Sequence, residues 1–396
     1  MTPAARAAAA IAVLDAWQAG KPAEQALTNW ARGARYAGSK DRAAVRDLVY
    51  DVLRARGSCA RLGGGEDGRA LILGLCRLQG TDPEHVFTGD AYGPPALRPD
   101  ELAGFTDPAL VDPQDDVPPW LLDRLAERAG ADLPALLAAL HARAPLYLRV
   151  NTRKITPEAC ITQLAAEGVT AVADPRAVTA LEVTSGARQV KSTAAYGDGL
   201  IEPQDLSVQR AVLAVDWPKG AILDYCAGGG GKSLAIAALT GQRIAAHDAA
   251  PQRMTDLPRR AARAGAMIDI VRTEALVQSG PFAAVLCDVP CSGSGTWRRD
   301  PEAKWRLTPA RLDGLVALQA EILDAAAALI APGGQLVYMT CSLFQAENEA
   351  QIAAFLTRHP GWHCLSEGYD TPLTASDGFY HAVLRAPRSS CLCNFR

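Results

Sequence analysis

The chain has 396 residues, 49% of them hydrophobic, which is enough for two or three domains that each bury a core. Its net charge of −3 excludes a protein that holds nucleic acid through an overall positive charge, so any RNA binding must come from local clusters of basic side chains. The sequence shows no apolar run of membrane-spanning length and no signal peptide, so we expect a cytoplasmic protein.

Ten cysteines are scattered along the chain without the paired spacing that zinc sites and disulfide frameworks show. We therefore expect reduced thiols and no bound metal. Residues 387–396 form a short tail that contains Cys391 and Cys393, and we interpret these two cysteines as chance composition.

Residues 1–88 have the apolar periodicity of helices. Thr2 and Pro3 suit the cap and the first turn of a helix, and apolar side chains then recur at helical spacing as far as Trp17. A second helix is predicted from Ser39, with one apolar stripe and several arginines on its other faces. The stretch predicts a small all-α bundle.

Residues 89–119 are rich in proline, glycine and aspartate and lack periodicity, which predicts a linker. Residues 120–199 then combine a helical pattern as far as His141, a strand pattern at 146–151 and a helical pattern at 156–168 that ends on a glycine. This second stretch predicts a small α/β unit.

Residues 200–386 repeat the order strand, turn, helix, which predicts a doubly wound parallel sheet. The carboxyl ends of the strands are where such folds place reactive and binding groups, so the side chains there are candidate functional residues. The four predicted strands are residues 221–225, 243–248, 282–288 and 334–340.

The first of these strands leads into the sequence DYCAGGGGKS at residues 224–233. Its glycine run precedes a predicted helix, an arrangement that brings backbone amides and a helix N-terminus up to a cofactor. It is not a phosphate-binding P-loop, because no Gly-x4-Gly frame precedes Lys232. A mere tight turn has the same glycines, which are Gly228, Gly229, Gly230 and Gly231.

The second predicted strand ends in Asp248, an acidic residue about twenty positions after the glycine turn, where a carboxylate can accept a hydrogen bond from a ribose. S-adenosylmethionine and NAD both contain such a ribose. The choice between these cofactors must therefore come from the other strand ends.

The third and fourth predicted strands each lead into a cysteine. Asp288 and Cys291 occur in DVPC after the third strand, and Cys341 occurs in MTCS after the fourth. Neighbouring strand ends can bring these two thiols into one pocket. Free cysteines are more often buried apolar residues, and that is our interpretation of Cys59, Cys76, Cys160, Cys287 and Cys364.

Two thiols beside a carboxylic acid suit methyl transfer to C5 of cytosine. A thiolate that adds to C6, with protonation of N3 by an acid such as Asp288, turns the ring into an enamine whose C5 attacks a sulfonium methyl group. The C5 proton must then leave and the first thiol must be expelled, which gives the second thiol a function. Hydride transfer gives neither cysteine a function, so the sequence favours S-adenosylmethionine.

The loop after Cys291 mixes basic and aromatic side chains in the sequence WRRDPEAKWR, residues 297–306. This mixture is typical of sites for phosphates and unstacked bases, although a solvated loop with its tryptophans packed inward has the same composition. We predict RNA contacts here, with Arg298, Arg299, Lys304 and Arg306 as the candidates.

Together these motifs resemble the Sun family of RNA 5-methylcytosine methyltransferases. DYCAGGGGKS is similar to the family's cofactor motif, DVPCSGSG to its Pro-Cys motif and MTCS to its Thr-Cys motif, in the family's order. The resemblance implies a Rossmann-like sheet that binds S-adenosylmethionine. It also implies that Cys341 is the nucleophile and that Cys291 assists release.

The same resemblance assigns a cofactor site. One acidic contact of the family falls on Glu274, where the family more often has aspartate, and the family's Ala-Pro-Gly-Gly turn is replaced here by four glycines. The implied contacts are Cys226, Ala227, Gly228, Gly229, Gly230, Gly231, Lys232, Asp248, Arg253, Glu274, Asp288 and Pro290.

The N-terminal sequence SKDRAAVRDLVYDVLR, residues 39–54, is similar to the NusB-like domain of the bacterial small-subunit ribosomal RNA methyltransferase B branch. The resemblance implies that residues 1–88 are a NusB-like RNA-binding domain, that 120–199 are an RRM-like unit and that 200–386 are the methyltransferase domain. Small-subunit ribosomal RNA is then the implied substrate. A monomer without a membrane partner is expected.

The residues alone leave other functions open. A DNA cytosine methyltransferase uses its Pro-Cys thiol as the nucleophile and would give Cys341 no role. A non-catalytic assembly factor would bind ribosomal RNA through its helical domain, and a hydride-transfer enzyme would use the same glycine turn. Amino-group methyltransferases place an aromatic residue where this chain has Cys291, which disfavours them.

Overall fold

The structure is a computed structural model that describes residues 1–104, 107, 109 and 111–388. The chain forms two compact units. The helical unit comprises Met1–Ala142 together with Trp297–Arg306, and the α/β unit comprises Arg143–Thr296 together with the chain from Leu307 onward. Cys391 and Cys393 lie outside the described residues.

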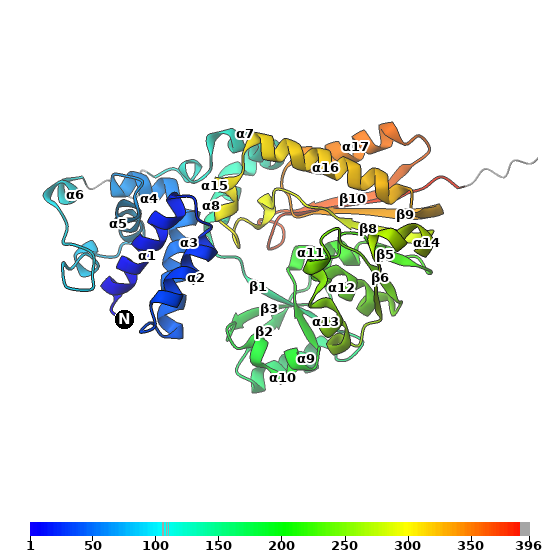
Figure 1. The fold of residues 1–396 in the computed structure, drawn as a ribbon, viewed down its shortest axis with the longest axis horizontal. Helices are drawn as coiled ribbons and strands as arrows, with labels where there is room; N and C mark the ends of the chain where they lie inside the picture. The colour runs from blue at the N-terminus through cyan, green and yellow to red at the C-terminus, as the bar shows by residue number, and fades with distance from the viewer. Residues whose placement is uncertain (105–106, 108, 110, 389–396) are drawn as a thin grey trace, which may run out of the picture. The chain divides into compact units, whose positions relative to one another are not determined.

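The helical unit is the bundle that the sequence predicted, and it is drawn mainly in blue in Figure 1. Thr2 caps its first helix by accepting a hydrogen bond of 3.1 Å from the backbone of Ala5. The apolar stripes of the helices meet in a core whose members include Leu14, Val49 and Leu71. The helices are α1 (Pro3–Gln18), α2 (Ala23–Gly33), α3 (Ser39–Arg54), α4 (Arg56–Gly63), α5 (Gly68–Leu78), α6 (Pro99–Ala103), α7 (Pro119–Ala129), α8 (Leu133–His141) and α15 (Glu302–Arg306).

One buried carboxylate connects α8 to this bundle. Asp116 is fully buried and accepts hydrogen bonds from the amide and the hydroxyl of Ser58 on α4, while its other neighbour is His141 on α8, with Nε2 3.0 Å from the carboxylate. The structure therefore groups residues 120–142 with the helical unit, whereas the sequence pattern grouped them with the strand that follows.

The α/β unit begins with a small antiparallel sheet of strand order β2-β3-β1-β4. The strand predicted at 146–151 is confirmed, as is the following helix, which Thr156 caps by accepting from the backbone of Ala159. The elements are β1 (Leu146–Val150), α9 (Pro157–Ala166), β2 (Thr170–Ala173), β3 (Ala180–Ser185), α10 (Ala194–Gly197) and β4 (Ile201–Pro203).

A larger sheet of seven strands follows, with the order β10-β11-β9-β8-β5-β6-β7. The five strands from β9 to β7 are parallel and include all four that the sequence predicted, while β10 and β11 extend the sheet in the antiparallel sense. The strands are β5 (Ile222–Asp224), β6 (Ile244–Ala246), β7 (Ile268–Ile270), β8 (Phe282–Asp288), β9 (Ile330–Thr340), β10 (His363–Asp370) and β11 (Phe379–Arg385).

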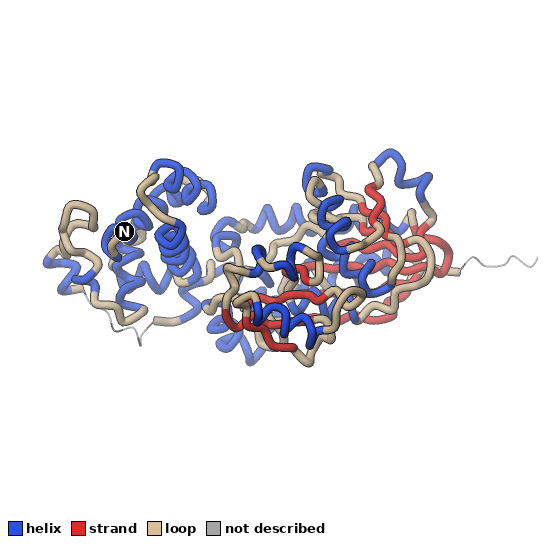
Figure 2. The backbone as a smooth tube through the Cα atoms, turned by 90° about the horizontal axis from the view of Figure 1, so that it is seen from below, coloured by secondary structure: helices blue, strands red, loops and turns tan. Residues whose placement is uncertain are grey.

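Helices cover both faces of the large sheet, so its central strands are apolar on both sides (Figure 1). Leu336 packs with α16 and α17 on one face, and its neighbour Val337 packs with α11 and α12 on the other. Figure 2 shows the strands of the unit in red. The helices are α11 (Leu206–Leu213), α12 (Gly231–Thr240), α13 (Leu257–Ala264), α14 (Leu276–Ser279), α16 (Pro309–Ala327) and α17 (Glu349–Arg358).

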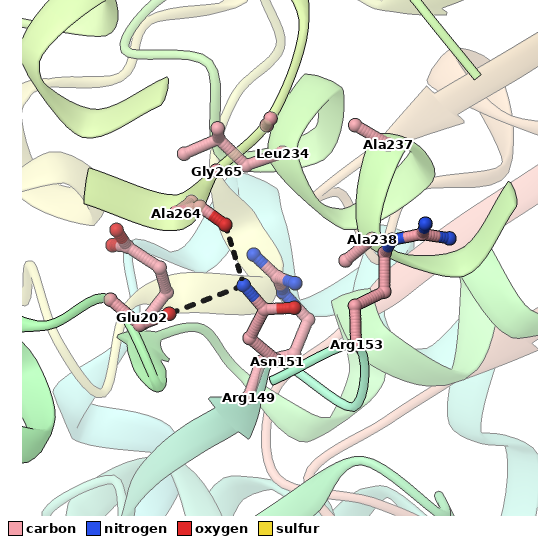
Figure 3. Close-up of a pocket in the computed structure, with 11 residues that line it drawn as sticks. Arg149, Asn151, Arg153, Glu202, Leu234, Ala237, Ala238, Ala264 and Gly265 are labelled. Atoms are coloured by element: carbon pink, nitrogen blue, oxygen red, sulfur yellow. Dashed lines mark hydrogen bonds between the residues drawn. The ribbon is translucent and has the colours of Figure 1, made fainter. Parts of the chain in front are cut away.

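The small sheet is held against helix α13 by Asn151, the last residue of the strand predicted at 146–151. Its amide donates to the carbonyl of Ala264 at the end of α13 and to that of Gly199 (Figure 3). Arg149 lies beside it in a pocket closed by α12, and burial lowers the pKa of its guanidinium to about 10. The end of the predicted strand thus joins the small sheet to a helix that packs on the large one.

In the part of the chain that the structure describes, no helix combines the length and the hydrophobicity needed to cross a lipid bilayer.

Candidate active site

The glycine-rich turn joins β5 to α12 next to the point where the strand order reverses, between β5 and β8. This is the position where doubly wound sheets bind their ligands. Gly230 caps α12 with a φ of +78°, and a Cβ atom on it would lie 2.1 Å from Cδ1 of Leu257. Only glycine fits this position, so the motif is required by the turn itself.

Asp248 follows β6 and faces the same turn. Its carboxylate is 4% exposed and accepts hydrogen bonds from the amides of Gly228 and Ala250, at 2.8 and 2.9 Å. Arg253 places Nη1 3.2 Å from Asp248 Oδ2 and leaves much of its side chain exposed. The structure thus brings three of the predicted cofactor residues together, and Glu274 lies exposed just after the neighbouring strand β7.

Asp224 ends β5 beneath the glycine turn and is fully buried. Burial raises the pKa of its carboxyl group to about 7, although a hydrogen bond from Ser233 on α12 works in the opposite direction. Its Oδ1 atom has no hydrogen-bond partner among the described residues. The sequence marked this residue only as the start of the glycine motif.

Lys232 and Asp288 form an ion pair of 2.6 Å that connects the first turn of α12 to the end of β8. Burial opposes the charged form of Lys232, but the charges of Asp288 and, more weakly, of Cys341 outweigh burial and raise the pKa of the ammonium group. The ammonium also lies 5.1 Å from the ring centre of Phe379. The predicted acid is therefore held beside a positive charge.

The two predicted catalytic cysteines meet at the ends of adjacent parallel strands. Cys291 follows β8, Cys341 follows β9, and their sulfur atoms lie 3.3 Å apart. The loops are further joined by a hydrogen bond from the amide of Gly295 to the carbonyl of Cys341. Two residues fifty positions apart in the sequence thus form one site.

The protonation of Cys291 is set by its surroundings. Its contact with Cys341 raises the pKa of the Cys291 thiol well above the usual range, and burial and the charges of Cys341 and Glu347 act in the same direction. Cys291 is thereby held as a thiol. Burial likewise raises the pKa values of Cys226 and Cys287, and the cysteines that we interpreted as core residues are buried, apart from the half-buried Cys364.

Glu347 is a residue of this site that the sequence analysis missed. It is fully buried behind the two cysteine loops and accepts hydrogen bonds from Ser292 and Ser342, which directly follow the cysteines. Gln319 on α16 donates both to Glu347 and to the carbonyl of Pro290. An acidic residue just before a helix is most simply interpreted as an exposed cap, so the sequence carries no signal for this arrangement.

The segment 297–306, which we predicted to contact RNA, packs within the helical unit. Lys304 is 3% exposed and donates to the backbone carbonyl of Arg54 at 2.8 Å, while the indole of Trp305 donates to that of Leu53. Glu302 accepts from the indole of Trp17 and the amide of Ala23. The segment thus completes the helical bundle.

This packing buries two of the four residues predicted to contact RNA and leaves the other two exposed. Arg298 and Lys304 are buried, whereas Arg299 and Arg306 are exposed. Arg306 is also paired with Glu302 and donates to the carbonyl of Lys21. RNA contact at these residues stays a prediction, and the structure gives Lys304 and Arg306 a role in holding the bundle.

The residues at the carboxyl edge of the large sheet fit a cofactor that carries a ribose and a positive charge. The glycine turn leaves backbone groups accessible, and Asp224 has a buried oxygen without a partner among the described residues. Asp224, Asp248 and Asp288 stand at the ends of three neighbouring strands. A cationic sulfonium nucleoside suits this set of carboxylates, which favour positive charge.

Comparison with known proteins agrees with the motifs. The family model described as 16S rRNA methyltransferase RsmB/F matches residues 212–389, and the ferredoxin-like domain model of RsmF/B-like methyltransferases matches residues 117–190. Ribosomal RNA small subunit methyltransferase B of Erwinia tasmaniensis is 30% identical over 91% of this chain and 94% of its own length. The protein of the same name from Vibrio cholerae is 28% identical over 96% of both chains.

Solved structures agree with the fold. The crystal structure of PH0851 matches 97% of this chain and 99% of its own with a TM-score of 0.75 at 24% identity. A methyltransferase homologue from Pyrococcus horikoshii matches 71% of this chain with a TM-score of 0.61 at 25% identity, and covers its own chain completely. The expected cofactor, S-adenosylmethionine, is confirmed by the family. The chain belongs to the RsmB/F family of S-adenosylmethionine-dependent rRNA methyltransferases, as its motifs predicted.

Proposed function

We propose that this protein methylates C5 of a cytosine in small-subunit ribosomal RNA, with Cys341 as the nucleophile. The observation that carries the proposal is the 3.3 Å distance between the sulfur atoms of Cys291 and Cys341, beside the Lys232–Asp288 ion pair. The names of the relatives support the substrate, since they are methyltransferases of small-subunit ribosomal RNA.

Cys341 begins the reaction by forming a bond from its sulfur to C6 of the cytosine. The Lys232 ammonium and Cys341 interact electrostatically, and this interaction contributes to the raised pKa of the lysine. The pair of Asp288 and Lys232 delivers a proton to N3, so that negative charge does not accumulate on the ring. The cofactor supplies a methyl group bound to a positively charged sulfur.

Cys291 acts after methyl transfer. The proton on C5 passes to solvent water before the bond between C6 and Cys341 breaks, and its electron pair is the one that re-forms the C5–C6 double bond. The Cys291 thiol lies beside the nucleophile, where it can donate a hydrogen bond to the departing Cys341 sulfur. When the C6–S bond breaks, its electron pair returns to Cys341, the C5–C6 double bond re-forms and the proton on N3 is given back. The site is then ready for another turnover.

Methyl transfer and covalent trapping test these assignments together. Wild type, Cys341→Ala and Cys291→Ala are incubated with labelled S-adenosylmethionine and unmethylated small-subunit ribosomal RNA, and the products are run on denaturing gels. We expect wild type to transfer methyl groups, Cys341→Ala to be inactive without an adduct, and Cys291→Ala to accumulate a protein–RNA adduct.

Other outcomes point to the alternatives. Methyl transfer by Cys341→Ala together with loss of adduct formation in Cys291→Ala would mean that Cys291 is the nucleophile, as in DNA cytosine methyltransferases. If wild type methylates neither RNA nor DNA but binds ribosomal RNA, the assembly-factor function would replace the proposal.

The RNA is also held, in this proposal, by a basic surface on α2 and α3 of the helical unit. Arg42 and Arg46 are exposed one turn apart on α3 and line a groove with Trp30 and Thr28 of α2. Arginines beside an aromatic ring suit phosphates and an unstacked base. Further exposed cations on the same two helices and their connection are Arg32, Arg35 and Lys40.

Salt dependence tests this surface. Changing Arg42 and Arg46 to alanine removes two phosphate contacts, so the slope of log affinity against log salt should fall in magnitude by about 1.4 for single-stranded RNA. Arg98→Ala is the matched control, since Arg98 is already paired with Asp100 and Glu101. An unchanged slope in the double variant would exclude these arginines as RNA contacts.

A further inference from the structure

The two cysteine loops share one buried anchor. The carboxylate of Glu347 accepts from the amide of Ser292 at 2.8 Å, from the hydroxyls of Ser292 and Ser342, and from the amide of Gln319 at 3.0 Å. Each of its two oxygens accepts two of these four hydrogen bonds, which fills the capacity of a carboxylate. The residues after both reactive cysteines therefore hold the same group.

The residues before the two cysteines are held as well, by the side chains of Gln319 and Asn348. Gln319 donates to the carbonyl of Pro290, which precedes Cys291, and Asn348 accepts from the hydroxyl of Thr340, which precedes Cys341. Asn348 also donates to the carbonyl of Ser342. Both thiols are consequently fixed on either side by one continuous hydrogen-bond network.

A glutamate is an uncommon residue at a buried position that has only a structural role. A buried carboxylate costs several kcal/mol unless its hydrogen bonds compensate the loss of water. Within the described residues, no lysine or arginine forms an ion pair with it, so four hydrogen bonds alone stabilise its charge. A glutamine of the same shape would point N–H groups at some of these donors.

We propose that Glu347 is a positioning residue for methyl transfer, which fixes the loops of Cys291 and Cys341 so that the two sulfur atoms stay in contact. The inference rests on the proposed function for its catalytic part. Its structural part, the distance between the thiols, does not depend on any substrate. The negative charge of Glu347 also contributes to the raised pKa of the Cys291 thiol, after the contact with Cys341 and burial.

Thiol cross-linking measures the loop positions without RNA. Diamide oxidises two adjacent thiols to a disulfide and is itself reduced, and mass spectrometry of the digested protein quantifies the Cys291–Cys341 linkage. In Glu347→Gln we expect the linkage to form about tenfold more slowly than in wild type, as lost hydrogen bonds to a charged group would predict. Glu321→Gln, an exposed glutamate on α16, is the control and should match wild type.

Single-turnover methyl transfer measures the catalytic consequence. We expect the rate in Glu347→Gln to fall about 100-fold, the size expected for a misplacement of about 1 Å, while the Kd values for RNA and S-adenosylmethionine stay within about threefold. Wild-type linkage and transfer rates in a folded Glu347→Gln would overturn the proposal. A loss of affinity without loss of rate would overturn it too.

Smaller changes keep the test decisive if Glu347→Gln does not fold. Ser292→Ala and Ser342→Ala each remove only one of the four hydrogen bonds to Glu347, so both variants should still fold, and both should slow linkage and transfer. Normal rates in both serine variants would overturn the proposal. If wild type transfers no methyl group, the proposed function fails, but the linkage rates still decide whether Glu347 positions the thiols.

Discussion

Lys232 and Asp288 lie on different sides of the topological switch point, yet their charged atoms are 2.6 Å apart. One belongs to the glycine motif and the other to the Pro-Cys motif, which are more than fifty residues apart in the sequence. The pair therefore connects the cofactor turn with the loop that carries Cys291.

Removal of Lys232 should disable catalysis. In Lys232→Met the carboxylate of Asp288 loses its partner and Cys341 loses a nearby positive charge, so we expect the single-turnover rate to fall about 100-fold or more. The double variant Lys232→Met, Asp288→Asn should be little slower than either single variant, because the two residues act as one unit. Additive losses would contradict this, and the exposed Lys219→Met is the control.

A side chain at position 230 should strain the glycine turn. Gly230→Ala combines a left-handed φ with a Cβ atom against Leu257, and we expect a loss of roughly 1–3 kcal/mol in the free energy of unfolding together with weaker S-adenosylmethionine binding. Urea unfolding and titration calorimetry measure the two effects. Gly314→Ala, at an exposed position of α16, should instead stabilise the protein, since nothing lies near its added methyl group. Normal cofactor affinity in Gly230→Ala would show that the turn is not part of the site.

Asp224 should make the protein less stable as the pH rises. Its pKa is raised by burial to about 7 in the folded state, against an ordinary value of 3.8, so between these values the folded protein holds a proton that the unfolded chain has lost. Stability therefore falls across about pH 4 to 7, by an amount on the order of 4 kcal/mol. Urea unfolding at pH 5 and at pH 8 tests this. The free energy of unfolding of Asp224→Asn, relative to that of wild type, should be higher at pH 8 than at pH 5. The exposed Asp216→Asn should show no such gain, and parallel curves for Asp224→Asn and wild type would refute the prediction.

Lys304 should make the protein more stable as the pH rises. Burial lowers the pKa of its ammonium to about 7, against 10.5 in the unfolded chain, so the unfolded chain binds the extra proton between these values. Stability then rises with pH across about 7 to 10, as the cost of the buried charge disappears. When the pH is raised from 6.5 to 9.5, the melting temperature of wild type should therefore rise relative to that of Lys304→Met. If Lys304 were exposed, the difference between the two proteins would not change with pH.

Much of the fold could be predicted because its strands and helices leave local patterns. The parallel strands are continuous apolar segments that end in the reactive residues, and Thr2 and Thr156 are recognisable helix caps. The strand β7 left no such pattern, since its three residues, Ile268–Ile270, lie at the sheet edge and include an exposed aspartate. The strand β10 is similarly exposed along most of its length.

The candidate site could be predicted only where a residue belongs to a motif. Cys291 and Cys341 were assigned to one pocket because the ends of parallel strands must meet, and the structure brings them together. Glu347 has no such marker, because its importance comes from partners far away in the sequence, such as Ser292. The tryptophans of 297–306 show the same limit: basic and aromatic composition alone does not distinguish a surface for RNA from a segment packed into a bundle.

The segment 297–306 also makes the helical unit discontinuous in the chain, with consequences for the order of folding. During synthesis, Met1–Ala142 emerges first, but the side chains of Glu302 and Trp305 that complete its packing are made only after the small sheet and strands β5 to β8 of the large one. At ribosomal rates this delay is on the order of ten seconds or more. The first part of the protein to be made therefore acquires its final packing late, and a fragment that ends at Ala142 should melt well below the full chain.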